Sequence, residues 1–166
     1  MAMIETRVDG LALDITTNSP VVILSPVEYD KVLPIWIGHS EAWAIAMELS
    51  QIPSKRPMTH DLLRMVITAL GANVERVEIT DLKDQTFYAR IMLTFNGKGV
   101  SIDSRPSDSI ALALKAHSPI FVEESLLNLK VSEDDKQDGS TLGNDPESLK
   151  DRLKRINPED FGKYSL

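Results

Sequence analysis

The order of the strand-like segments constrains the fold more than any other feature of this 166-residue sequence. Short apolar runs and segments of alternating polarity occur in two consecutive groups. A doubly wound parallel sheet needs a helix between successive strands, so this order favours hairpins. The sequence therefore predicts an α/β fold of the α+β type, with a mixed, largely antiparallel sheet and helices packed on it. Strands are expected at residues 4–8, 11–15, 21–24, 33–37, 74–80, 86–95 and 99–103, with turns at 9–10, 81–84 and 96–97.

Three helices are expected around these strands. Ser40 is predicted to cap a helix over residues 41–49 and Thr59 to cap one over 60–70, because hydroxyl oxygens accept hydrogen bonds from the free N–H groups of a first turn. Pro106 is predicted to open a helix over 107–117. The second helix should bury an apolar stripe and end at Gly71. The stripe consists of Leu62, Leu63, Val66, Ile67 and Leu70.

The chain length and its hydrophobic content of 42% suit a single core. Residues 1–130 are therefore read as one domain. Residues 131–145 contain few apolar groups and are predicted to be an acidic linker. Residues 146–166 are predicted to form a C-terminal helical tail, which Asp145 caps and which carries an apolar face of Leu149, Leu153 and Ile156.

Composition excludes several classes of function. The chain has no cysteine, so disulfides, Cys-ligated zinc and thiol nucleophiles are ruled out. The N-terminus lacks a secretory pattern and no apolar run could span a bilayer, so a cytoplasmic protein with no membrane partner is expected. The net charge of −7 disfavours a broad electropositive surface, so any binding of nucleic acid must rest on a local site.

Two segments, residues 56–61 and 103–108, each combine Arg-Pro with a helix start. A helix start carries a partial positive charge and free N–H groups, and an adjacent guanidinium adds a two-pronged clamp. Arg56, Arg105, Ser104 and Ser107 are therefore candidate phosphate-binding residues. His60 is the best candidate for general acid–base catalysis, because histidine exchanges protons near neutral pH.

The same residues also have structural interpretations. Ser104 or Ser107 could be a helix cap, and Asp61 and Asp108 could complement helix dipoles. Arg105 could pair with an acidic neighbour, the choices being Asp103, Asp108 and Glu41. The carboxylates could instead recruit Mg or Mn, although their spacing matches no known ligand pattern and the metal stays unassigned. Trp36 and Trp43 are expected to be core or interface aromatics rather than base-stacking platforms.

Several dispersed motifs resemble the bifunctional nuclease domain, formerly a domain of unknown function. They cover residues 33–38 with 41–42, then 56–62, 86–89, 102–113 and 119–122, so that the resemblance spans about residues 3–130. It implies a compact α/β domain, often homo-oligomeric, and cleavage of both RNA and DNA. Positions in the matched motifs, together with their chemistry, make Glu41, His60, Asp61, Asp103 and Asp108 the candidate catalytic residues.

Two hypotheses follow. In the first, the chain is a nuclease that hydrolyses phosphodiester bonds with help from a divalent metal; Arg56 and Arg105 hold phosphate, and His60 or a metal-bound water supplies the nucleophile. In the second, it is a non-catalytic regulatory or scaffold module that acts through protein–protein contacts. The first hypothesis expects the two Arg-Pro segments to meet in one cleft or at one subunit interface.

Overall fold

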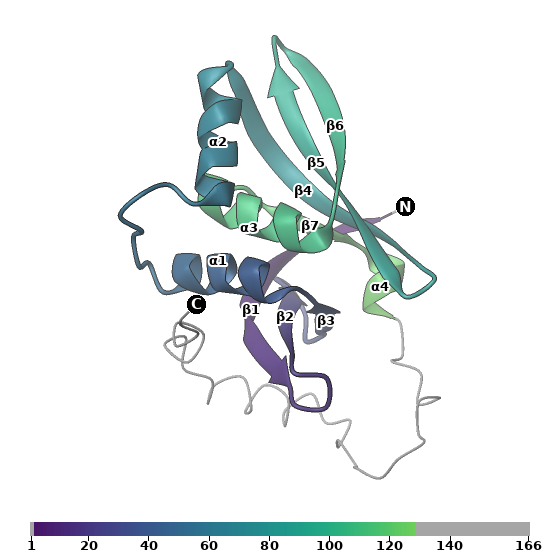
Figure 1. Ribbon diagram of the computed structural model, residues 1–166. Coiled ribbons are helices and arrows are strands. Elements are labelled where there is room, and N and C mark those ends of the chain that lie inside the picture. The colour runs from purple at the N-terminus through teal and green to yellow at the C-terminus, as the bar shows by residue number, and fades with distance from the viewer. Residues whose placement is uncertain (1, 129–166) are drawn as a thin grey trace.

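The computed structural model describes residues 2–128. Their strands form one seven-stranded sheet in the order β3-β2-β1-β7-β4-β5-β6. Only the β4–β7 pair is parallel in this sheet, so the predicted mixed, largely antiparallel sheet with helices is confirmed (Figure 1). The elements are β1 (Met3–Asp14), β2 (Ser19–Pro26), β3 (Leu33–Trp36), α1 (His39–Leu49), α2 (Thr59–Ala69), β4 (Ala72–Lys83), β5 (Thr86–Phe95), β6 (Lys98–Ser104), α3 (Pro106–Ala116), β7 (Ile120–Glu123) and α4 (Glu124–Leu127).

The first strand is longer than predicted. The expected turn at residues 9–10 was wrong, because β1 continues through it and pairs with β2 on both sides. The register shifts between Val8 and Gly10, which makes Asp9 the extra residue of a bulge. Asp9 also accepts a hydrogen bond from the Ser25 hydroxyl of β2, so its polar side chain is used within the sheet. A dipeptide typical of a turn can thus lie within a strand, as a bulge, when the partner strand is long enough to pair with the residues on both sides of it.

The second strand group forms the hairpins β4–β5 and β5–β6. The predicted turn at 81–84 was placed too early, since β4 runs to Lys83, which pairs with Thr86. The actual turn is Asp84–Gln85, where both residues have positive φ, as a tight two-residue hairpin requires. The predicted turn at 96–97 is confirmed, with positive φ at Asn96 and Gly97.

Strand β7 joins the two halves of the sheet and was not predicted as a strand. It pairs antiparallel with β1 and parallel with β4. The Thr6 hydroxyl donates a hydrogen bond of 3.1 Å to the carbonyl oxygen of Ile120, which adds a side-chain contact to this central ladder.

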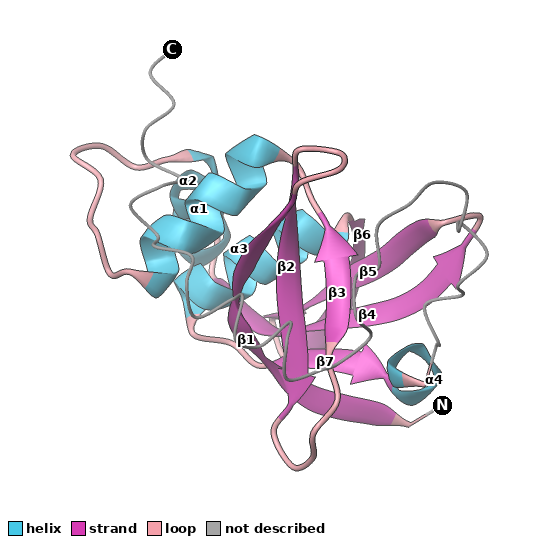
Figure 2. Cartoon of the chain, turned by 90° about the horizontal axis from the view of Figure 1, so that it is seen from below, coloured by secondary structure: helices cyan, strands magenta, loops and turns pink. Residues whose placement is uncertain are grey.

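The three long helices gather on one side of the sheet (Figure 2). Helix α3 lies between α1 and α2 and also contacts β4 and β5. The core beneath the helices includes fully buried residues from both halves of the sheet and from α1 and α3: Val22, Leu24, Ile45, Val77, Ile79, Ile110 and Leu112. Helix α3 buries most of its residues from Pro106 to Ala113, so it is packed closely between α1 and α2.

The helix starts differ from the predicted caps. Helix α1 begins at His39 after Gly38, and α2 begins at Thr59 after Met58, so neither Ser40 nor Thr59 is a cap. In α2 the Asp61 carboxylate accepts a hydrogen bond of 3.0 Å from the Met58 N–H, which replaces a hydroxyl cap. Pro106 opens α3 as predicted.

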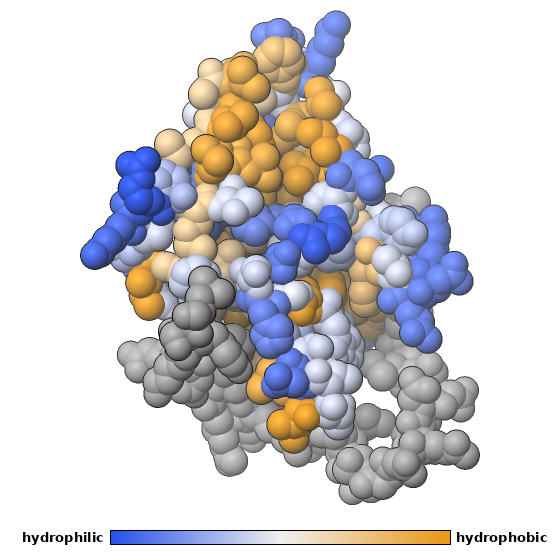
Figure 3. All heavy atoms as spheres, viewed as in Figure 1, coloured by the Kyte–Doolittle hydropathy of each residue, from blue (hydrophilic) through white to orange (hydrophobic). Residues whose placement is uncertain are grey.

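The predicted buried stripe of α2 was largely wrong. Leu62 is 55% exposed and Leu70 is 70% exposed, and within the stripe only Ile67 packs against the core. These side chains belong to an apolar surface that continues onto β5 and β6, here called the α2–β6 face (Figure 3). It consists of Leu62, Leu63, Met65, Val66, Leu70, Phe95, Val100 and Ile102.

Two further predictions concern the remaining chain. The predicted linker at 131–145 and helical tail at 146–166 lie outside the described residues. Among residues 2–128, no helix has the length and apolarity required to cross a bilayer.

Candidate functional site

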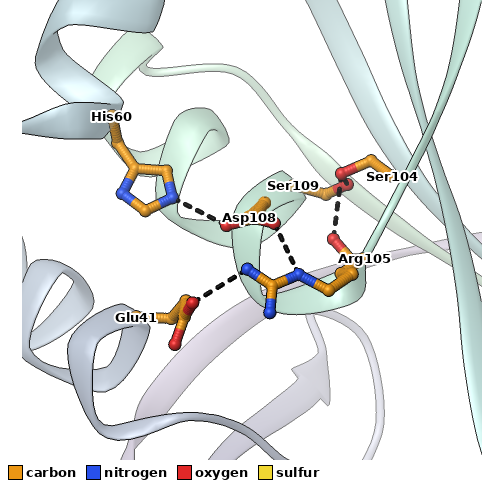
Figure 4. Close-up of polar contacts among 6 residues, drawn as sticks. All are labelled: Glu41, His60, Ser104, Arg105, Asp108 and Ser109. Atoms are coloured by element: carbon orange, nitrogen blue, oxygen red, sulfur yellow. Dashed lines mark hydrogen bonds and ion pairs between the residues drawn. The ribbon is translucent and has the colours of Figure 1, made fainter.

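Three helix starts converge at the centre of the helical layer (Figure 4). Glu41 lies in the first turn of α1, His60 in the first turn of α2, and Arg105 and Asp108 at the start of α3. They meet because α3 packs against both α1 and α2. The fold thus brings residues separated by up to 67 positions into one polar cluster, since 108 − 41 = 67.

The four side chains form a continuous chain of hydrogen bonds and ion pairs, here called the helix-start network. The Asp108 carboxylate lies 3.0 Å from Nε2 of His60 and accepts a hydrogen bond of 2.8 Å from Nε of Arg105. Arg105 Nη2 donates a second hydrogen bond of 2.8 Å to Oε1 of Glu41. Two of the three pairings proposed for Arg105 from the sequence are therefore present.

The network extends from the protein interior to solvent. His60 is buried, with 8% of its surface exposed, whereas the Arg105 side chain is 65% exposed. Burial acts to raise the pKa of Asp108, but hydrogen bonds from Arg105 and His60 outweigh it and the pKa is lowered. Asp108 is therefore ionised at neutral pH. An ionised carboxylate accepts the proton of Nε2–H, which leaves Nδ1 of His60 as the basic nitrogen.

Gly38 provides the space that Glu41 occupies. A Cβ atom at position 38 would collide with the Glu41 carboxylate group. The backbone of Gly38 is extended, with φ −74° and ψ 158°, so the requirement for glycine here is one of space and not of backbone conformation. Sequence reasoning missed this role of Gly38.

Asp61 belongs to a neighbouring cluster. Its carboxylate lies 3.1 Å from Nζ of Lys115, which also pairs with Glu48 at 3.0 Å. The Lys115 side chain is only 9% exposed, so this cluster ties α1, α2 and α3 together beneath the network. Burial raises the pKa of Asp61, but the Met58 N–H and Lys115 outweigh that effect and lower it. Lys115 was missed in the sequence, although it lies seven residues after Asp108 and thus on the same side of α3.

The remaining candidates are not in the network. Asp103 on β6 pairs in register with Arg90 on β5, whose side chain bonds to Glu78. Side chains alternate between the two faces along a strand, so Asp103 lies on the sheet face opposite Ile102 and Ser104. Arg56 lies in the exposed loop before α2; its carbonyl oxygen accepts a hydrogen bond of 2.7 Å from Ser54, and no contact joins its side chain to the network.

The two serine candidates lie beside the network. Ser104 donates a hydrogen bond of 3.0 Å to the carbonyl oxygen of Arg105 and accepts one of 2.9 Å from Ser109. Ser107 is 6% exposed, and no hydrogen bond joins its side chain to another described residue. The two Arg-Pro segments therefore meet only through His60, Arg105 and Asp108.

A preformed metal site is not part of this arrangement. No group of three or more His, Asp or Glu residues within residues 2–128 has the geometry to hold a metal ion. The carboxylates of the network are instead directed at Arg105 and His60.

Comparison with known proteins supplies the family. The sequence profile of the bifunctional nuclease domain matches residues 22–134, a range that contains the whole helix-start network. The chain belongs to the bifunctional nuclease domain family. This confirms the resemblance seen in the sequence motifs. In this bifunctional nuclease domain protein, the matched range begins within β2 and includes every later element through α4.

Relatives of this bifunctional nuclease domain protein fall into two groups. An uncharacterized protein of Mycobacterium tuberculosis is 40% identical over 162 residues, which cover 95% of this chain and 97% of that protein. Bifunctional nuclease 1 of Oryza sativa subsp. indica is 27% identical over 100 residues, 58% of this chain and 30% of the plant protein. Bifunctional nuclease 1 of Arabidopsis thaliana is 26% identical over 98 residues, with 57% and 30% covered.

Proposed function

We propose that this protein is a nuclease that hydrolyses phosphodiester bonds of RNA and DNA at the helix-start network. The observation that carries the proposal is the continuous chain from a buried His60–Asp108 pair to an exposed Arg105. Membership of the bifunctional nuclease domain family and the names of the plant relatives support it.

Each member of the network has a distinct role in this proposal. Arg105 uses Nε and Nη2 for Asp108 and Glu41, so its exposed side chain presents Nη1 to a phosphate oxygen. Glu41 and Asp108 hold the guanidinium in place. Asp108 also fixes the tautomer of His60, so that Nδ1 accepts a proton from the attacking water. As the water oxygen bonds to phosphorus, the P–O bond to the leaving sugar oxygen breaks and that oxygen takes up a proton from solvent, while Arg105 stabilises the negative charge that develops on the phosphoryl oxygens.

We also propose that cleavage requires Mg or Mn, although none of the steps above depends on the ion. The described residues offer no preformed set of three ligands, so an ion would have to gain ligands from the substrate phosphate. Turnover in Mg, Mn or chelator tests this point. Full activity in chelator would refute the metal requirement while leaving the roles of the four side chains intact.

The test of catalysis is turnover of single-stranded RNA and DNA by rigorously purified protein. His60→Ala and Asp108→Asn are expected to lower the rate about 10²- to 10⁴-fold, the range for loss of a general acid or base. Glu28→Gln, a change in the β2–β3 loop, serves as the matched control and should keep the wild-type rate. Equal rates in all four proteins would assign the cleavage to another site or to a contaminant.

A non-catalytic regulatory module is the second candidate. It is favoured by the pairing within the network, because Arg105 already has two carboxylate partners and does not need a phosphate. Pure wild-type protein that binds oligonucleotides no better than its Arg105→Met variant, and shows no turnover, would establish this candidate over the nuclease.

We further propose that the protein is a cytoplasmic homo-oligomer that meets nucleic acid only at this local site. The α2–β6 face supports self-association, because apolar residues exposed in one contiguous patch are typical of interfaces. The overall charge of −7 supports a local site over a broad nucleic-acid surface.

A further inference from the structure

A hollow lies beside the helix-start network. Its volume is about 370 Å³, within the range of sites for small organic ligands. It forms because the end of β3 and the start of β5 both approach the start of α3. The side chains and backbone that matter for its chemistry are those of Trp36, Gly38, Phe87, Arg105 and Ser107.

Trp36 gives the hollow an aromatic wall that is open to solvent. The residue is 50% exposed, so of the two expected roles, core or interface, the core role is wrong. Its indole Nε1–H donates a hydrogen bond of 2.9 Å to Oδ2 of Asp14, which restrains the ring at the rim. Hydrogen bonds from Thr16 and Trp36 lower the pKa of Asp14 to about 2, so this acceptor is ionised at neutral pH. A half-exposed tryptophan with a fixed orientation is suited to stack on a flat ligand.

Ser107 adds a polar group to the lining of the hollow. It lies at the second position of α3, where backbone N–H groups have no acceptor within the helix. The residue as a whole is 6% exposed, and no hydrogen bond joins its hydroxyl to another described residue. Its Oγ is not fully enclosed, so the hydroxyl can exchange a hydrogen bond with water or with an oxygen or nitrogen of a bound molecule.

We propose that this hollow receives one base of a single-stranded nucleic acid, with the base stacked on Trp36 and the adjacent phosphate against Arg105 and Ser107. The proposal rests on the proposed nuclease function and adds a substrate class to it. In a duplex, bases are stacked on each other and their faces are not available to a protein ring. Phe87, on the β5 side, provides a second apolar surface.

The strongest alternative is that Trp36 only packs against another protein. A pure protein contact would not require an aromatic wall, a cation and a hydroxyl around one hollow. These three features match the three parts of a nucleotide that need recognition: the base face and two phosphate oxygens.

The test uses the two tryptophans of the chain, Trp36 and Trp43. In a Trp43→Phe background, intrinsic fluorescence reports on Trp36 alone. A thymidine trinucleotide should quench this signal, whereas an abasic trinucleotide with the same phosphates should not. Anisotropy of a labelled trinucleotide should show binding about 5- to 100-fold weaker for Trp36→Leu, as expected for loss of one stacked base.

Control variants separate stacking from general damage. Trp36→Phe keeps an aromatic face and should retain most of the affinity, Trp43→Phe should bind like wild type, and Ser107→Ala should weaken both trinucleotides. Equal affinity for the normal and abasic trinucleotides, or unchanged binding by Trp36→Leu, would overturn the proposal. No detectable binding by folded wild type would overturn it too.

The cleavage assay distinguishes this proposal from the proposed function. If wild type cleaves single strands but its affinity does not depend on Trp36, the hollow is not the base site and the nuclease function stands. If binding depends on Trp36 and on the base but purified protein has no turnover, the hollow stands as a binding site and the nuclease function fails.

Discussion

At the scale of single residues, Asp108 is the member of the network that joins its buried end to its exposed end. It contacts His60 and Arg105, while Arg105 alone reaches Glu41. Loss of its charge would leave the His60 ring buried without its acceptor and would remove one of the two anchors of the guanidinium. The position of Asp108 therefore couples the buried and exposed ends of the network.

Asp108 should also make folding stability depend on pH. Because its pKa is lowered in the folded protein, its contribution is complete above the unfolded pKa near 4 and is lost as pH falls toward the lowered value. Urea unfolding of wild type and Asp108→Asn should differ by about 1 kcal/mol at pH 7. This difference should shrink between about pH 5 and pH 2. A difference that stays constant across that range would contradict the assigned ion pairs.

Gly38→Ala should separate stability from activity. The backbone angles of Gly38 suit alanine, and the atoms in the way are the end of a flexible side chain, so the free energy of unfolding should change by less than about 1 kcal/mol. The Glu41 carboxylate must nevertheless move, and it then no longer holds Arg105. We expect turnover to fall to the level of Glu41→Ala.

The double variant Gly38→Ala/Glu41→Ala completes this cycle. If the alanine methyl group acts only through Glu41, the double variant should be no slower than Glu41→Ala alone. Additive losses would show that Gly38 affects the site by another route.

At the scale of elements, the first turn and inner face of α2 have one role and its outer face has another. Its first turn supplies His60 to the network and Asp61 to Lys115, and Ile67 packs inward. Its other face remains exposed beside β5 and β6. The strong apolar periodicity of α2 is thus better explained by an interface than by the core of one chain.

Leu62→Lys should test this interpretation of the α2–β6 face. Leu62 is 55% exposed, so the substitution should leave the fold intact and reduce the mass measured by light scattering at tens of micromolar protein. Ile15→Lys is the matched control, because Ile15 is 81% exposed in the turn after β1 and lies outside the face. A monomeric wild type, or equal masses for all three proteins, would argue against self-association through α2.

At the scale of the whole molecule, local patterns predicted most elements but not how they are combined. The period of the apolar residues predicted seven strand segments, which cover six of the seven strands of the sheet, and three helices in nearly the right places. It could not predict that residues 9–10 form a bulge, because a bulge depends on the length of the partner strand. The apolar period also could not predict that the α2 stripe is exposed, because it does not tell whether the surface that covers such a stripe lies in the same chain.

For the candidate site, too, local patterns predicted most of the residues but not all of their arrangement. Arg105, Asp108 and His60 were identified by residue type and by position at helix starts, and Glu41 by its place in a matched motif; the fold brings the four together. Asp103 was grouped with them because it is close in sequence, but a strand sends successive side chains to opposite faces. The hollow at Trp36 involves β3, β5 and α3, and no local pattern connects those segments.

The central position of β7 also affects the order in which the molecule can form. Thr6 and Ile120 are neighbours in the sheet although 114 residues separate them. During synthesis, β1–β3 and β4–β6 can each form hairpins as they leave the ribosome, but they remain separate units until the strand that lies between them has emerged. Closing such a long loop carries an entropy cost before any contact repays it. Insertion of β7 is therefore the late event that unites the two hairpin units and completes the sheet beneath α3.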